Sequence, residues 1–227
     1  MISRLKKIII ISAVLLGIIF LAVSFFQKSD APISKVDVIT NDGLSCVSRQ
    51  KLIDKVTDIS QGSWLDVDAT NIEKYLYGIK GVDYVLVKKI WPSTLVLYMY
   101  DRKPIAYWND NQILLINMDT VSPDLVITPK ELPHIYSGDE NNRGYVYDVY
   151  EKLDRIAKEH SIGITRLDYG GNQFSITLSG DIKLYLGSKD LEKKLQMFFL
   201  LHTSVKNYES VKYYDMRYSY GFAVKYK

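Results

Sequence analysis

Three histidines, His134, His160 and His202, are the residues of this 227-residue chain best suited to acid–base chemistry or zinc binding. They fall in separate segments, and neither an H-E-x-x-H pair nor a nucleophile elbow lies near them. The single cysteine, Cys46, excludes an intramolecular disulfide and a thiol-rich metal site. Phosphate-binding and dinucleotide-binding glycine motifs are also missing. The sequence therefore predicts no catalytic residue, no metal and no cofactor.

The acidic residues that stand out have structural explanations. Asp68 precedes a helical pattern, and we expect its carboxylate to cap that helix. Asp139 and Glu140 lie in a polar stretch that we interpret as a solvated turn. Asp101 and Arg102 are predicted to form a surface pair of little energetic weight.

Charge is distributed unevenly along the chain. The first 28 residues hold four basic residues and no acid, which leaves 25 basic and 26 acidic residues for the remainder. A basic surface for nucleic acid is therefore not expected in the larger part of the chain.

An uncharged apolar run of 19 residues extends from Ile8 to Phe26. This length suits a helix that crosses the hydrocarbon core of a bilayer. Arg4, Lys6 and Lys7 precede the run, so the positive-inside rule places residues 1–7 in the cytoplasm as a short tail and the bulk of the chain across the membrane. A cleaved signal peptide is the alternative, but the run continues past the small residues at 22–24 that would mark the cleavage site.

The next segment, residues 33–103, predicts a small α+β domain with the order β-α-α-β-β. In chain order, the predicted elements are a strand at 33–40, a turn at Asn41–Gly43, a helix at Ser48–Ile59, a helix after Asp68, and strands at Val82–Ile90 and Thr94–Tyr100. Trp91 and Val82 are predicted to lie in its core or to plug its edge. The order resembles that of a POTRA domain, a protein-binding module found next to membranes.

Residues 104–227 predict a second α+β domain in which strands dominate. The predicted strands are Ile105–Trp108, Ile113–Asn117, Phe174–Leu178, Ile182–Leu186, Tyr213–Tyr218 and Phe222–Tyr226. The predicted helices are Val146–His160 and Lys189–His202. Turns are expected at Asn109–Asn111, Gly170–Asn172 and Ser179–Asp181.

Several dispersed motifs resemble the FtsQ/DivIB family of bacterial cell-division proteins. The matching positions are Gly62, Leu65, Val67, Asp68, Val82, Trp91, Pro92, Leu95, Asp101, Arg102, Pro104, Ala106, Trp108, Asp215, Arg217, Tyr218, Gly221, Ala223 and Val224. The chain departs from the family pattern at Thr120, where glycine is frequent, and at Tyr226, where tryptophan is more usual.

The resemblance implies a non-enzymatic scaffold of the division machinery, anchored in the inner membrane through Ile8–Phe26, with its bulk in the periplasm and concentrated at the septum. The implied partners are an FtsB-like and FtsL-like coiled-coil pair and other membrane proteins of the division machinery. The scaffold would help control septal peptidoglycan synthesis. In the family, the closing strand recruits FtsB by strand addition, which implies partner contacts at Arg217, Tyr218, Gly221 and Tyr226.

The residues themselves support an edge position for that closing strand, because no further strand follows Phe222–Tyr226 in the given sequence. Met216, Phe222 and Val224 are expected to complete the core. Two other functions stay open: a membrane-anchored periplasmic cell-wall enzyme, which lacks a visible nucleophile or metal cluster, and a POTRA-bearing component of an export system.

Overall fold

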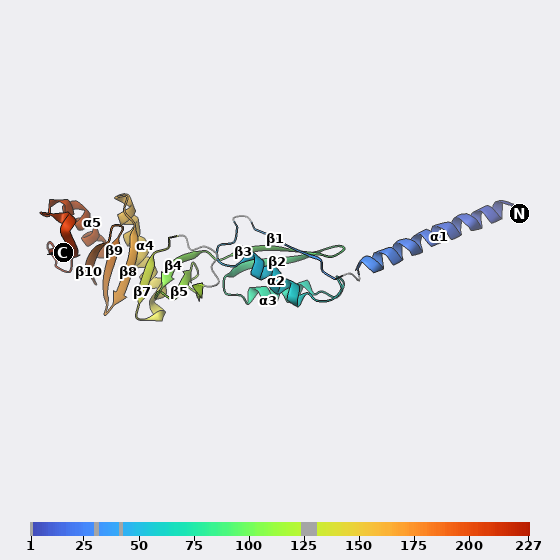
Figure 1. The fold of residues 1–227 in the computed structure, drawn as a ribbon, viewed down its shortest axis with the longest axis horizontal. Helices are drawn as coiled ribbons and strands as arrows, with labels where there is room; N and C mark the ends of the chain where they lie inside the picture. Colours follow the sequence, from blue (N-terminus) through green and yellow to red (C-terminus); the bar gives the residue numbers. More distant parts are fainter. Residues whose placement is uncertain (1, 30–31, 41–42, 124–130) are drawn as a thin grey trace. The chain divides into compact units, whose positions relative to one another are not determined.

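The computed structural model describes residues 2–29, 32–40, 43–123 and 131–227, so most of the turn predicted at Asn41–Gly43 lies outside the described residues. The chain divides into two compact units, Met1–Arg102 and Lys103–Lys227. Each unit combines a β-sheet with helices (Figure 1), which confirms the predicted α+β class.

The first helix, α1 (Ile2–Ser29), is 28 residues long. Its described apolar side chains are exposed, among them Leu16 and Phe20 at 66% and 72%. Over the residues that the structure describes, none of the helices combines the length and the apolarity needed to cross a membrane. The membrane span expected at Ile8–Phe26 stays a prediction.

A three-stranded sheet with the order β1–β3–β2 forms the centre of the first unit. β1 (Lys35–Ile39) is parallel to β3 (Thr94–Asp101), and β3 is antiparallel to β2 (Val82–Ile90). The helices α2 (Arg49–Ile59) and α3 (Ala69–Tyr77) lie on one side of this sheet (Figure 1). The element order is therefore the predicted β-α-α-β-β.

Helix caps and helical periodicity explain where these two helices form. The Asp68 carboxylate accepts hydrogen bonds from the amides of Thr70 (2.9 Å) and Asn71 (3.3 Å), so the predicted cap is confirmed. Ile72 and Leu76, four residues apart on α3, are both buried against the sheet side. The cap at Asp68 and the burial of Ile72 and Leu76 therefore both favour α3.

The carboxylate of Asp101 organises the loop before α2. Its Oδ2 accepts hydrogen bonds from the backbone amides of Ser45 (2.6 Å), Cys46 and Val47 (3.3 Å). Arg102 instead contacts Asp83, with 3.4 Å between Nε and Oδ1. The predicted interpretation of Asp101 as a surface charge of little weight is therefore wrong, because its side chain satisfies a set of loop amides.

The prediction for the core of the first unit holds for Val82 and fails for Trp91. Val82 is 2% exposed, whereas Trp91 is 41% exposed at the turn between β2 and β3. The Trp91 ring stacks on that of Phe25, with 5.6 Å between centroids. Trp91 is thus a surface side chain of the hairpin tip.

In the second unit, the structure describes a nine-stranded sheet with the order β12–β11–β10–β9–β8–β7–β4–β5–β6. Its strands are β4 (Pro104–Trp108), β5 (Gln112–Leu115), β6 (Thr120–Val121), β7 (His134–Ser137), β8 (Ile164–Gly170), β9 (Gln173–Leu178), β10 (Ile182–Gly187), β11 (Val211–Asp215) and β12 (Ala223–Tyr226). The pairs β4/β7, β7/β8 and β10/β11 are parallel, and the other neighbouring pairs are antiparallel. Strands β6, β7 and β8 are absent from the strands predicted above.

The three predicted hairpin turns are confirmed. Each has two consecutive residues with positive φ, the geometry of the type I′ turns that often connect antiparallel strands. The residues are Asn109 and Asp110, Gly171 and Asn172, and Gly180 and Asp181. These turns connect β4 to β5, β8 to β9 and β9 to β10.

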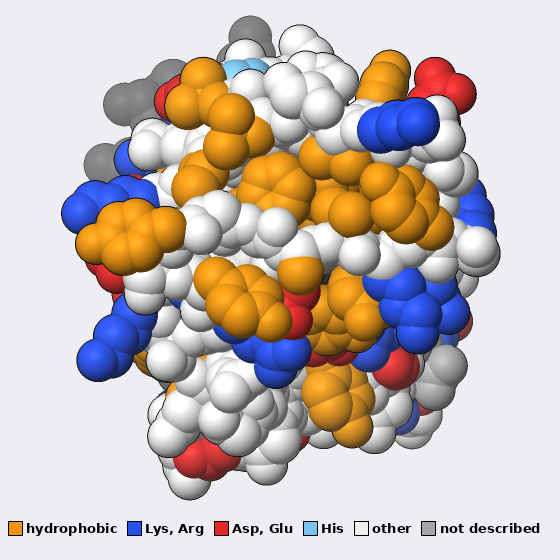
Figure 2. All heavy atoms as spheres, turned by 90° about the vertical axis from the view of Figure 1, so that its left-hand side faces the viewer, with side chains coloured by type: hydrophobic (Ala, Val, Ile, Leu, Met, Phe, Trp, Pro, Cys, Tyr) orange, Lys and Arg blue, Asp and Glu red, His pale blue; other side chains and the backbone are white. Residues whose placement is uncertain are grey.

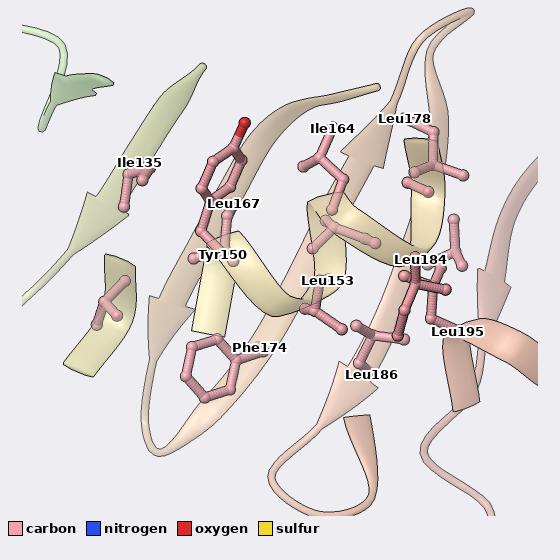
Figure 3. Packing of buried hydrophobic residues seen from close by; sticks show 14 of the residues in the cluster. Ile135, Tyr150, Leu153, Ile164, Leu167, Phe174, Leu178, Leu184, Leu186 and Leu195 are labelled. Carbon is pink, nitrogen blue, oxygen red and sulfur yellow. The ribbon is translucent and has the colours of Figure 1, made fainter. Parts of the chain in front are cut away.

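Two helices, α4 (Arg143–Glu159) and α5 (Leu191–Leu201), cover the sheet of the second unit. Figure 3 shows Leu153 of α4 and Leu195 of α5 in one cluster with the sheet residues Leu184 and Leu186, and both helix leucines are fully buried. Short 3-10 helices occur at Glu140–Asn142, His202–Ser204 and Tyr208–Ser210. The continuous core reaches the end of the sheet, because Tyr214 of β11 belongs to it and Val224 of β12 packs against it.

Candidate partner-binding edge

The strand β12 occupies one edge of the nine-stranded sheet, because β11 is its only neighbour among the described strands. Backbone amides alternate in direction along a strand. The Lys227 amide donates to the Ser210 carbonyl (3.0 Å), toward β11. By the same alternation, the backbone N–H and C=O groups of Val224 and Tyr226 face away from β11. They form the donor and acceptor row that an added strand would use.

The loop between β11 and β12 is held by Arg217. Its Nε and Nη2 donate to the two carboxylate oxygens of Asp215, at 2.8 Å and 2.6 Å. The hydrogen bonds from Arg217 hold the pKa of the Asp215 carboxyl below its ordinary value of 3.8, although partial burial acts in the opposite direction. The preceding residue, Met216, is buried, and its amide donates to the Tyr185 carbonyl in β10 (2.8 Å). The loop therefore leaves the sheet from a fixed point.

The other three residues assigned to partner binding lie on this loop or on β12. Tyr218 is 56% exposed, and Tyr226 is 44% exposed with its hydroxyl donating to the Lys206 carbonyl (3.0 Å). Gly221 has φ +90°, and a Cβ at this position would meet nothing within 4 Å. The glycine is thus required for its backbone conformation and not for a close contact within the chain.

Tyr220 is the residue of this loop that sequence reasoning missed. Its side chain is 97% exposed, the highest value among the large hydrophobic side chains described. Nothing in its sequence neighbourhood distinguishes it from the other tyrosines. Its exposure follows from the loop geometry between the buried Met216 and the partly buried Phe222.

The surface around the edge mixes hydrophobic and basic side chains. Figure 2 looks onto the left-hand end of Figure 1, where the C-terminus lies, and shows hydrophobic groups separated by Lys and Arg. Leu200 and Tyr208 contribute exposed apolar surface in this unit. A hollow of about 610 Å³ includes Tyr220, Arg217, Lys189, Lys193 and Lys194 in its lining. Such a surface suits an amphipathic partner that carries acidic side chains.

The three histidines considered for catalysis do not form one site, and each contacts a different neighbour. His134 stacks on Tyr107, whereas His160 stacks on Phe199 at the end of α4. His202 ends α5, and its Nδ1 lies 3.1 Å from the Phe198 carbonyl oxygen. Over the described ranges, His, Cys, Asp and Glu side chains form no group of three or more that could hold a metal.

Cys46 also lacks the features of a nucleophile. It is 1% exposed, and its burial, followed by the nearby Asp101 charge, raises the pKa of the thiol to about 11. Because the thiolate is the reactive form, this cysteine stays protonated and unreactive near neutral pH. Its surroundings are those of a core residue.

Comparison with known proteins places this architecture in a functional class. A family model described as "Cell division protein FtsQ/DivIB, C-terminal" matches residues 106–217, most of the second unit. The matched unit is that of a cell-division protein. The match ends at Arg217, so Tyr218, Gly221 and Tyr226 lie just beyond it.

Curated relatives extend the likeness over most of the chain. A Haemophilus influenzae protein is 28% identical and aligns with 93% of this chain and 87% of its own length. A Coxiella burnetii protein is 24% identical over 80% of this chain and 75% of its own. An Escherichia coli protein is 30% identical over 70% of this chain and 59% of its own length. All three are named cell division protein FtsQ, and the chain belongs to the FtsQ/DivIB family.

Proposed function

We propose that this chain is a non-enzymatic, membrane-anchored scaffold of the bacterial division machinery that binds an FtsB-like and FtsL-like coiled-coil pair. In this proposal, a strand of the FtsB-like partner adds to the free edge of β12, and the complex helps control septal peptidoglycan synthesis. The observation that carries the proposal is the edge position of β12, with the backbone groups of Val224 and Tyr226 directed away from β11.

The four residues assigned to partner binding, three in the loop before β12 and Tyr226 on β12 itself, have different roles in this proposal. Tyr218 provides an exposed aromatic anchor, because a large rigid side chain of this kind contributes strongly to binding when a partner buries it. Arg217 holds the loop through Asp215 and adds positive charge to the neighbouring hollow. Gly221 permits the turn into β12, and the Tyr226 backbone pairs with the added strand.

The membrane anchor is the second part of the proposal. We place it at Ile8–Phe26, with the short segment 1–7 in the cytoplasm and the large remainder in the periplasm. The support comes from the 19 uncharged residues and the basic residues before them. Protease added to spheroplasts should degrade the large domain, and a mature N-terminus found near Phe25 would show cleavage instead.

The first unit has a role of its own in this scheme. We propose that residues 33–103 form a POTRA-like module that contacts other membrane proteins of the division machinery. The support is the β-α-α-β-β order with two helices on one side of a three-stranded sheet. Its exposed surfaces, and not the buried residues such as Val82, would carry those contacts.

A pull-down with the full chain from solubilised envelopes tests the function. Recovery of coiled-coil division proteins is the expected result. Recovery of glycan strands or of secretion components, without division proteins, would support the enzyme or export alternative and overturn the scaffold. A chain shortened after Ser219 provides the matched control, because it lacks β12 and should lose the coiled-coil partners.

A further inference from the structure

The turn between β2 and β3 carries apolar side chains that are partly exposed to solvent. Ile90 and Trp91 are 49% and 41% exposed, and Leu65 is 50% exposed. Leu65 lies beside this hairpin, as the hydrogen bond from the Lys89 ammonium group to the Leu65 carbonyl (3.2 Å) shows. Turns in contact with water usually carry small polar residues. A tryptophan and two aliphatic side chains together therefore indicate a contact surface. We call Leu65, Ile90 and Trp91 the tip surface.

The chain connection limits how far the tip surface can lie from the end of the apolar run. The Ser34 amide donates to the Ser93 carbonyl (2.9 Å), and their hydroxyl oxygens are 2.7 Å apart. Ser34 is thus fixed to the hairpin tip. From Phe26 to Ser34 the chain spans three residues of α1 and five more, which reach at most about 22 Å at helical and extended rises. A bilayer surface at Phe26 is within reach of the tip.

The side chains of the tip have the chemistry of a membrane interface. Tryptophan is enriched where hydrocarbon meets headgroups, because its ring is apolar and its N–H is polar. The stretch Lys88–Ser93 contains two lysines and no acid, so anionic headgroups would attract it. Trp91 stacks on Phe25, which lies next to the end of the apolar run. The two rings would therefore lie at the same depth in a membrane.

We infer that the tip surface docks on the outer leaflet of the membrane that anchors the chain, with Trp91 inserted at the headgroup level and Lys88 near anionic lipid. This inference rests on the proposed anchor at Ile8–Phe26. The docking holds the first unit against the lipid and restricts its orientation.

Bromine-labelled lipids test the inference, because bromine quenches only tryptophan within its reach. The full chain is reconstituted in vesicles of phosphatidylethanolamine and phosphatidylglycerol that carry bromine near the headgroup. We expect strong quenching for the wild-type chain and its loss in Trp91→Phe. Trp108→Phe is the matched control, because Trp108 is fully buried in the second unit, and this variant should keep the quenching.

The possible outcomes separate the docking from the anchor. If the chain floats with the vesicles but Trp91→Phe is quenched as strongly as wild type, the docking is overturned and the anchor stands. If the chain does not float with the vesicles at all, both the anchor and the docking are overturned. Loss of quenching in Ile90→Asp, with unchanged flotation and melting, would add support for the docking.

Discussion

Arg217 and Asp215 form a two-pronged ion pair at the start of the loop that leads into β12, with Nε–Oδ1 and Nη2–Oδ2 distances of 2.8 Å and 2.6 Å. Asp215 is largely buried, whereas about half of the Arg217 side chain is exposed. Planar two-point pairs of this kind fix geometry as well as charge. The pair therefore orients the backbone of the proposed partner-binding loop before any partner arrives.

The pH dependence of stability should report this pair. Since the pKa of Asp215 is lowered in the folded chain, its contribution is complete above its ordinary pKa of 3.8 and is lost as the pH falls through the folded-state value. We expect Arg217→Met to lower the melting temperature near neutral pH and to match wild type more closely below about pH 3.8. Thermal melts across this range measure the difference. A deficit that does not change with pH would contradict the assignment.

Gly81 should tolerate no side chain. Its φ is +134°, and a Cβ would lie 2.9 Å from the Cys46 Sγ and 3.3 Å from a methyl group of Val47. Gly81→Ala should therefore destabilise the first unit by about 1–3 kcal/mol, the usual cost of a strained backbone position. Gly43→Ala is the matched control, because Gly43 also has a positive φ but nothing within 4 Å of the added Cβ. Equal melting temperatures for the two variants would show that the close contact relaxes without cost.

The two tryptophans of the family motif should differ in their contribution to stability. Trp108 is fully buried, and its Nε1 donates to the Glu140 carboxylate (3.1 Å). Trp108→Ala should therefore lower the free energy of unfolding by about 3–5 kcal/mol. Trp91→Ala should cost much less, because Trp91 is 41% exposed. Denaturant unfolding of both variants gives the comparison. A larger loss for Trp91→Ala would mean that the hairpin tip belongs to the core.

Most elements of this fold could be predicted from periodicity and turn residues, and β8 shows where this fails. Ile164 and Leu167 both point into the core although they are three residues apart, because a bulge follows Ile164. The bulge breaks the alternation of period two by which strands are recognised. Arg166 and Asp168 form an ion pair on the same strand. These two charged residues make the segment look less like a strand in the sequence. Tertiary pairing with β7 and β9 establishes this strand.

The side-chain roles were less predictable than the elements. The sequence places Glu140 in a solvated turn, and its side chain is 51% exposed, but its carboxylate also accepts hydrogen bonds from Trp108 and Asn109, 32 and 31 residues earlier in the chain. Those bonds, with Arg143, outweigh the effect of burial and lower the pKa of Glu140. A long-range partner of this kind leaves no local sequence signal. For the same reason, the candidate site residues came from the family resemblance. The edge position of the closing strand was predictable from the sequence, but β11 ends at Asp215 and not at Tyr218, so only the structure places Arg217, Tyr218 and Gly221 in the loop before β12.

The affinity of the FtsB-like partner segment for the full chain and two of its variants tests the central claim most directly. Tyr218→Ala should weaken binding by about 2 kcal/mol or more, roughly 30-fold, if this tyrosine is a hot spot. Val224→Pro should also weaken it, because proline removes an edge amide that β11 does not use. Tyr226→Phe loses only the hydroxyl bound to Lys206 and should bind as wild type does. Calorimetric titration, with melting curves as the folding control, is predicted to give this order. If Tyr218→Ala and Val224→Pro melt normally and bind the segment as tightly as wild type, β12 is not the partner-binding edge.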